Sequence, residues 1–97
     1  FVSEINPTVR WQQQLDREAI TELTKEMQLA ADAGMLREGL EARVAALALH
    51  TFMKGIFLDW LRNPELFDLR EEGMAMLDLF FNGLRRQTPA AALAARS

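Results

Sequence analysis

The segment from residue 41 to residue 63 constrains the fold most, because its apolar side chains surround a helix on nearly every side. These side chains are Val44, Leu47, Leu49, Phe52, Met53, Ile56, Phe57, Leu58, Trp60 and Leu61. A helix that is apolar all round has to be enclosed, since soluble monomers rarely expose large continuous apolar patches. Its most apolar part, residues 45–61, is short for a membrane span and carries His50, Lys54 and Asp59. We therefore expect a core helix and no membrane partner.

Start and stop signals divide the chain into three helices. An asparagine before Pro7 predicts an N-cap with proline in the first turn, and the helix over residues 6–33 ends where Gly34 supplies a left-handed turn. The second helix, over residues 41–63, stops before Pro64, which disfavours helical geometry in the preceding residue.

The third helix is expected over residues 68–86, where Asp68 and Glu71 form an acidic variant of the capping box. Residues 89–97 follow as a flexible tail. No segment alternates between apolar and polar residues with a period of two, so the predicted fold class is all-α.

The first and second helices each present a distinctive face. One side of the first helix is apolar and carries Leu15, Ala19, Ile20, Leu23, Met27 and Ala30. On the second helix, His50 and Lys54 lie one turn apart beside Met53 and Phe57, which is typical of a cavity wall with a few polar groups. The other side of that helix has small residues and is typical of a helix contact. On periodicity alone, however, His50 is more often a hydrogen-bonded core residue and Lys54 a side chain that reaches solvent.

Composition excludes several function classes. The chain has no cysteine and one histidine, which argues against thiol chemistry, a metal centre and a disulfide framework. A net charge of −3 argues against a nucleic-acid surface within this segment. No nucleophile triad or phosphate loop occurs, so we expect no catalytic residues, no cofactor and no enzyme activity. The chain starts at Phe1 without a signal peptide, which predicts a cytoplasmic protein whose N-terminal part is missing.

A series of short motifs in a fixed order resembles the C-terminal domain of the AcrR branch of TetR-family transcriptional repressors. The motifs are Phe1-Val2-x-Glu4, Gln13-Gln14, Ala33-Gly34-Met35-Leu36, Ala45-Ala46, Gly55, Trp60-Leu61, Pro64 and Phe67-Asp68-Leu69. The resemblance covers residues 1–88 and depends on the ordered spacing, since each motif alone is common.

The resemblance implies a homodimer in which each subunit has an N-terminal helix-turn-helix head, absent here, and a helical body with a pocket. Residues 1–88 would form the ligand-binding and dimerisation domain. Residues 6–33, 41–63 and 68–86 would match the family's seventh, eighth and ninth helices. The last two helices of each subunit would form a four-helix dimer interface, and operator DNA would bind only through the missing domain.

Site residues follow from the resemblance together with the helix faces. The predicted ligand-binding residues are His50, Met53, Lys54, Phe57, Ala19, Leu23 and Met27. The predicted dimer interface consists of Ala45, Ala48, Phe52, Gly55, Ile56, Asp59, Met74, Leu77, Phe81 and Leu84. Some relatives have an acidic residue where Lys54 stands, so a neutral or anionic ligand is expected.

The expected function is repression of a multidrug efflux operon, relieved when a small hydrophobic effector binds. The alternative is a helical dimerisation or adaptor module that has no small-molecule site. In that alternative His50 and Lys54 would be buried against protein, with no cavity beside them.

Overall fold

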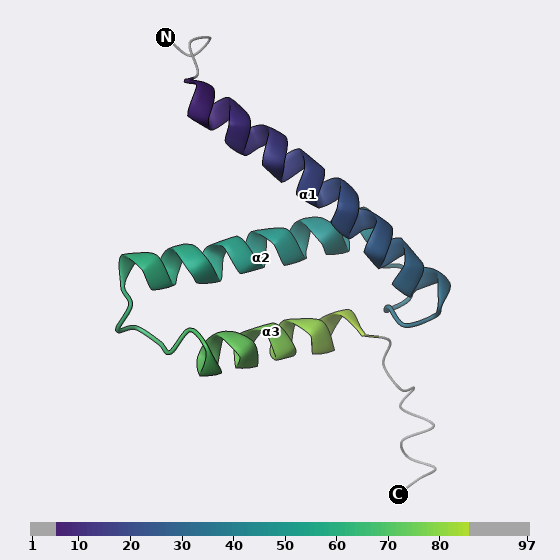
Figure 1. The fold of residues 1–97 in the computed structure, drawn as a ribbon. Helices are drawn as coiled ribbons and strands as arrows, with labels where there is room; N and C mark the ends of the chain where they lie inside the picture. The colour runs from purple at the N-terminus through teal and green to yellow at the C-terminus, as the bar shows by residue number, and fades with distance from the viewer. Residues whose placement is uncertain (1–5, 86–97) are drawn as a thin grey trace, which may run out of the picture.

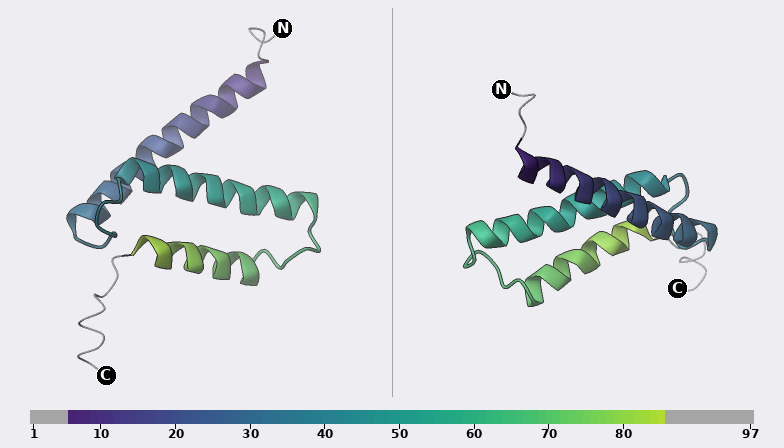
Figure 2. Two further views of the ribbon diagram at one scale, coloured as in Figure 1. Left: turned by 180° about the vertical axis from the view of Figure 1, so that it is seen from behind. Right: turned by 45° about the horizontal axis from the view of Figure 1, so that its top comes forward.

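The computed structural model describes residues 6–85 and has three α-helices in that range: α1 Pro7–Asp32, α2 Ala42–Arg62 and α3 Glu71–Leu84. The described residues form no strand beyond an isolated bridge between Leu36 and Arg85, so the predicted all-α class is confirmed. α1 crosses α2 near the N-terminal end of α2, and its own N-terminal half diverges from the other helices (Figure 1). α3 runs back antiparallel to α2, as the views in Figure 2 also show.

The ends of α1 follow the local chemistry of the sequence. Asn6 is the N-cap, and its side-chain oxygen accepts a hydrogen bond from the Val9 N–H at 3.0 Å. At the other end Gly34 has φ +75°, and the Met35 N–H donates to the Ala30 carbonyl at 3.0 Å. This is a Schellman C-cap, in which glycine supplies the left-handed residue.

The bounds of α2 and α3 lie within a few residues of the predicted ones. α2 ends at Arg62, just before Asn63, which has left the helical conformation and precedes proline. α3 begins at Glu71, later than predicted, and its N-cap is Arg70. In the turn before it, Asp68 Oδ1 accepts a hydrogen bond from the Glu71 N–H at 2.8 Å, as a capping box requires. The reciprocal bond comes from Glu72 instead of the predicted Glu71, with Glu72 Oε1 2.7 Å from the Asp68 N–H. The predicted end of this helix at residue 86 and the tail over residues 89–97 lie outside the described residues.

The core is small and lies where α1 crosses α2. Its buried hydrophobic residues among those described are Met27, Ala42, Ala45, Ala46 and Leu49. Three of the five are alanines, which allow the two helices to approach closely. Larger residues, including Leu23, Leu77 and Phe80, pack around this cluster and stay partly exposed.

α2 keeps much of its apolar surface exposed in this chain. Met53, Phe57 and Leu58 are each about half exposed, at 48%, 51% and 48%. By length and composition alone α2 could cross a membrane, a test that core helices of soluble proteins also pass. Its contacts with α1 and α3 fit a core helix whose remaining faces need further covering.

Candidate ligand-binding groove at the crossing of α1 and α2

The polar residues of α2 meet a carboxylate of α1. Asp16 Oδ1 lies 3.1 Å from His50 Nε2 and accepts a hydrogen bond from Lys54 Nζ at 3.2 Å. Within residues 6–85 no other side-chain hydrogen bond or ion pair joins α1 to α2. One oxygen atom therefore carries the polar connection between the two helices.

All three side chains of this cluster keep contact with solvent. Their exposed fractions are 34% for Asp16, 23% for His50 and 44% for Lys54. The hydrogen bonds from His50 and from Lys54 hold the pKa of Asp16 below its ordinary value, against a smaller opposing effect of partial burial. Asp16 is therefore a carboxylate at neutral pH.

A groove opens beside this cluster, and we refer to it as the His50 groove. It is bordered by Gln12, Leu15, Asp16, Ala19, Glu22, Leu23, His50, Met53 and Lys54. Its volume is about 660 Å³, within the range of pockets that hold drug-sized molecules. Four of its border residues are apolar, and His50, Lys54 and Asp16 supply the hydrogen-bonding groups.

Five of the seven predicted ligand-binding residues border the His50 groove, and two do not. Ala19 and Leu23 come from α1, and His50, Met53 and Lys54 come from α2. Met27 instead lies in the core, with 8% of its surface exposed. Phe57 is 51% exposed and stacks with Trp60, their ring centroids 6.3 Å apart. The assignment of all seven residues to a ligand site stays a prediction.

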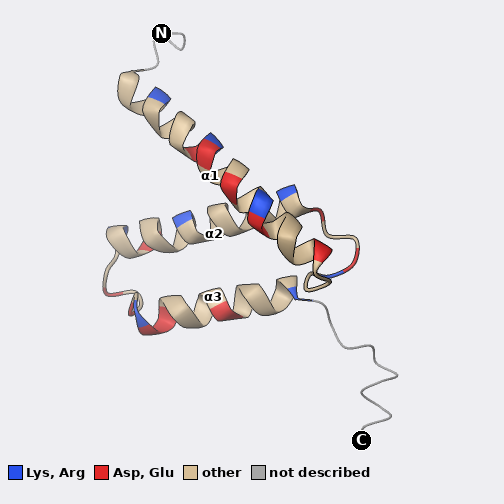
Figure 3. Ribbon diagram, turned by 45° about the vertical axis from the view of Figure 1, so that its right-hand side comes forward, with Lys and Arg blue, Asp and Glu red and all other residues tan. Residues whose placement is uncertain are grey.

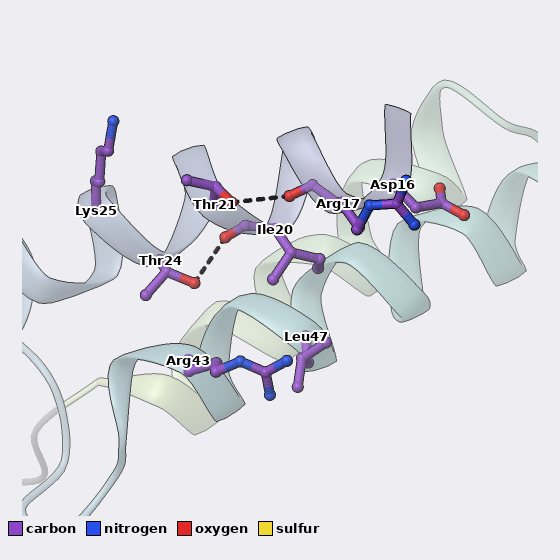
Figure 4. A pocket seen from close by; sticks show the side chains of 8 residues that line it. All are labelled: Asp16, Arg17, Ile20, Thr21, Thr24, Lys25, Arg43 and Leu47. Carbon is purple, nitrogen blue, oxygen red and sulfur yellow. Dashed lines mark hydrogen bonds between the residues drawn. The ribbon is translucent and has the colours of Figure 1, made fainter. Parts of the chain in front are cut away.

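A second groove lies against the same two helices and also includes Asp16 (Figure 4). It is bordered by Asp16, Arg17, Ile20, Thr21, Thr24, Lys25, Arg43 and Leu47, and its volume is about 670 Å³. The Thr21 and Thr24 hydroxyls donate to the carbonyls one turn earlier, so they offer only acceptors to a ligand. In Figure 4 Lys25 points away from α2, and its ammonium pairs with Glu22 at 3.1 Å.

Arg43, near the start of α2, also borders this second groove. Its side chain lies along α2 toward Leu47 in this second groove (Figure 4). Among the residues that the structure describes it makes no ion pair.

Sequence reasoning missed Asp16, although a signal was present. Asp16 precedes Ile20 by one helical turn and Leu23 by two, so it lies on the apolar side of α1. Charged residues are spread along the length of α1, while α2 carries fewer of them (Figure 3). A carboxylate on the side of α1 that faces α2 is expected to need a donor from that helix.

The predicted dimer residues differ in how far they are covered within this single chain. Ala45 is 1% exposed in the core, and the Phe52 ring stacks on Phe80 of the same chain with centroids 4.9 Å apart. Half-buried members are Ile56, Leu77 and Leu84, while the exposed members are Ala48, Gly55, Asp59, Met74 and Phe81. A smaller hollow of about 290 Å³ lies at Gly55 and is bordered by Phe52, Ile56 and Met76 among others. No cluster of three metal-ligating side chains occurs within the described residues.

Comparison with known proteins places these features in context. A TetR-type family model, described as the C-terminal region of MAATS-type transcriptional repressors, matches residues 1–85. Among solved structures, the chain is similar to SmeT, the repressor of the Stenotrophomonas maltophilia multidrug efflux pump SmeDEF. The two share 32% sequence identity with a TM-score of 0.71, over 81% of this chain and 41% of the SmeT chain. The chain thus spans less than half of SmeT. A search of the curated proteins found no match.

Proposed function

This chain belongs to the TetR family of transcriptional repressors, as a C-terminal region of the MAATS type, and we propose that it binds a small hydrophobic effector and pairs two subunits. The effector releases the repressor from its operator DNA. The regulated genes encode a multidrug efflux pump, a proposal supported by the likeness to SmeT. The repressor acts in the cytoplasm, where its DNA is, and carries no catalytic activity.

The His50 groove carries the effector proposal. Residues chosen from two separate helices, by helix face and by resemblance, border one hollow of about 660 Å³. The rival function, an adaptor module without a ligand site, requires His50 and Lys54 to be packed against protein. An open groove beside both side chains favours the effector-binding function.

Pairing of subunits is supported by the apolar surface that this chain leaves uncovered. Leu58 on α2 and Met74 on α3 are 48% and 62% exposed. A second copy that packs its α2 and α3 against these faces would enclose α2, as an all-apolar helix requires. Paired subunits would also hold two DNA-reading domains at the spacing of operator half-sites, about 34 to 36 Å.

Effector binding and operator binding are then linked, because each favours a different one of two conformations of the dimer. An effector that binds the operator-incompetent arrangement more tightly shifts the dimer toward it. A coupling free energy of about 1 to 3 kcal/mol lowers operator affinity by about 5- to 150-fold.

The test fills the groove and leaves the rest of the chain alone. Ala19→Trp in the complete gene product places an indole in the His50 groove, and Leu29→Trp adds the same group at an exposed position outside it. Binding of the neutral probe 1-N-phenylnaphthylamine is followed by its fluorescence, and release of labelled operator DNA by anisotropy. We expect Ala19→Trp to lose probe binding and probe-induced release, with Leu29→Trp unchanged. Equal responses from both variants and the unmodified protein would rule out this groove as the effector site.

A further inference from the structure

Asp16 stands where a ligand's anionic group would be bound. Its Oδ1 atom is within hydrogen-bond distance of His50 Nε2 and Lys54 Nζ, two groups one turn apart on α2. Two donors that converge on one carboxylate oxygen form a binding position for a carboxylate, whichever molecule provides it. In this chain the carboxylate comes from the protein itself.

The cluster can exchange this carboxylate without unfolding. Each of the three side chains is between 23% and 44% exposed, so Asp16 can rotate into water and keep its charge solvated. The incoming carboxylate would gain the same two donors that Asp16 gives up. The number of hydrogen bonds and the net charge of the bound cluster are both conserved in this exchange.

The surroundings of the cluster favour an anion with an apolar body. Leu15, Ala19, Leu23 and Met53 border the groove beside the donors. The other carboxylate at the border, Glu22, accepts from Lys25 at 3.1 Å, which offsets its repulsion of an anion. A cationic head group would instead meet the Lys54 ammonium and could use only the remaining oxygen of Asp16.

We propose that the effector class of the His50 groove is an amphiphilic carboxylate, whose carboxylate replaces Asp16 at His50 and Lys54 while its apolar body lies along Leu23 and Met53. Asp16 is then the specificity-determining residue, because it competes with the ligand for both donors. This inference rests on the proposed function and names the ligand class of the same groove. When the ligand carboxylate displaces that of Asp16, the polar connection between α1 and α2 is lost, so effector binding acts directly on the position of α1.

The test compares three probes with one aromatic body and different charge: 2-naphthoate, neutral 2-naphthamide and cationic 2-naphthylmethylammonium. Calorimetry measures their dissociation constants for the unmodified protein and for Asp16→Asn, which keeps the side-chain shape and removes the competing charge. We expect 2-naphthoate to bind Asp16→Asn about fivefold more tightly and Lys54→Gln about fivefold more weakly, the effect of one solvent-exposed ion pair. Binding of 2-naphthamide should change less than twofold in both variants.

Arg62→Gln is the matched control, because it removes an exposed basic residue of α2 that lies outside the His50 groove. Unchanged or weaker 2-naphthoate binding by Asp16→Asn overturns the inference, as does equal loss of the acid and the amide in Lys54→Gln. If circular dichroism shows that Asp16→Asn does not fold, His50→Gln and Lys54→Gln decide the question by the same comparison. Normal 2-naphthamide binding with no response of the acid overturns the ligand class alone. Failure of all three probes overturns the proposed function with it.

Discussion

Gly55 offers the sharpest test of the proposed subunit pairing, because a single chain has room for an added side chain there, whereas a close dimer contact would not. The residue lies on the exposed side of α2, and a Cβ atom added to it meets nothing within 4 Å. Glycine in a helix interior costs about 0.8 to 1.0 kcal/mol relative to alanine. Within one chain, Gly55→Ala should therefore stabilise α2 by about 1 kcal/mol.

In a dimer the missing side chain lets the partner's backbone approach closely. A leucine at this position would overpack the contact, at a cost of about 1 to 3 kcal/mol for each site. A two-fold axis repeats the site, so Gly55→Leu should weaken the dimer by about 2 to 6 kcal/mol. The dimer dissociation constant would then rise by at least about 30-fold.

The assay is sedimentation equilibrium of the complete gene product, with urea unfolding of the same samples to show that each variant folds. Gly83→Leu is the matched control: this glycine on α3 also has no atom within 4 Å of an added Cβ and is not among the predicted interface residues. We expect Gly55→Leu to dissociate while Gly83→Leu stays dimeric. A folded Gly55→Leu variant with the dissociation constant of the unmodified protein would refute a close contact at this position.

Two further predictions concern the crossing of α1 and α2. Leu49→Ala should lower the free energy of unfolding, measured in urea, by about 2 to 5 kcal/mol, because Leu49 is 6% exposed in a core of few large residues. The control Leu29→Ala, at a position that is 64% exposed, should change this free energy by less than about 0.5 kcal/mol. Because folding lowers the pKa of Asp16, its contribution to stability is complete above the unfolded value of about 3.9 and is lost as pH falls through the lower folded pKa. The urea concentration at the unfolding midpoint should therefore be lower for Asp16→Asn than for the unmodified protein at pH 7, and the two midpoints should converge in acid. The control variant Asp78→Asn, which replaces an exposed carboxylate, should keep the midpoint of the unmodified protein at pH 7.

The helix ends were predictable because capping chemistry acts within a few residues. The Asn6 side chain, the left-handed Gly34 and the proline after Asn63 each act on backbone groups next to them. The capping box of α3 shows where this locality stops. Adjacent glutamates can both reach back to the Asp68 N–H, and only the folded geometry selects Glu72.

The helix faces that form the site could be predicted from the sequence, but the burial of each residue on them could not. A helix wheel places Leu23 and Met27 on the same side of α1, yet Leu23 borders the groove while Met27 lies in the core. The difference depends on where α1 crosses α2. That point is set by the small residues of α2, such as Ala46 at 0% exposed, and by the connection over residues 33–41. Neither effect can be read from the periodicity of one helix.

Asp16 links the prediction of the site to the prediction of the fold, because its two hydrogen bonds also specify the register of α1 against α2. Sliding α1 by one turn would move its carboxylate about 5.4 Å along the helix, beyond hydrogen-bond reach of His50 and Lys54. The buried alanines set where the two helices cross, and the ion pair adds a directional constraint to the same register. A polar residue on an apolar helix face is therefore a register constraint as well as a possible ligand determinant. A ligand that takes the place of Asp16 removes the polar contact from this register, so a weak, solvent-exposed cluster can still influence how α1 is placed on α2.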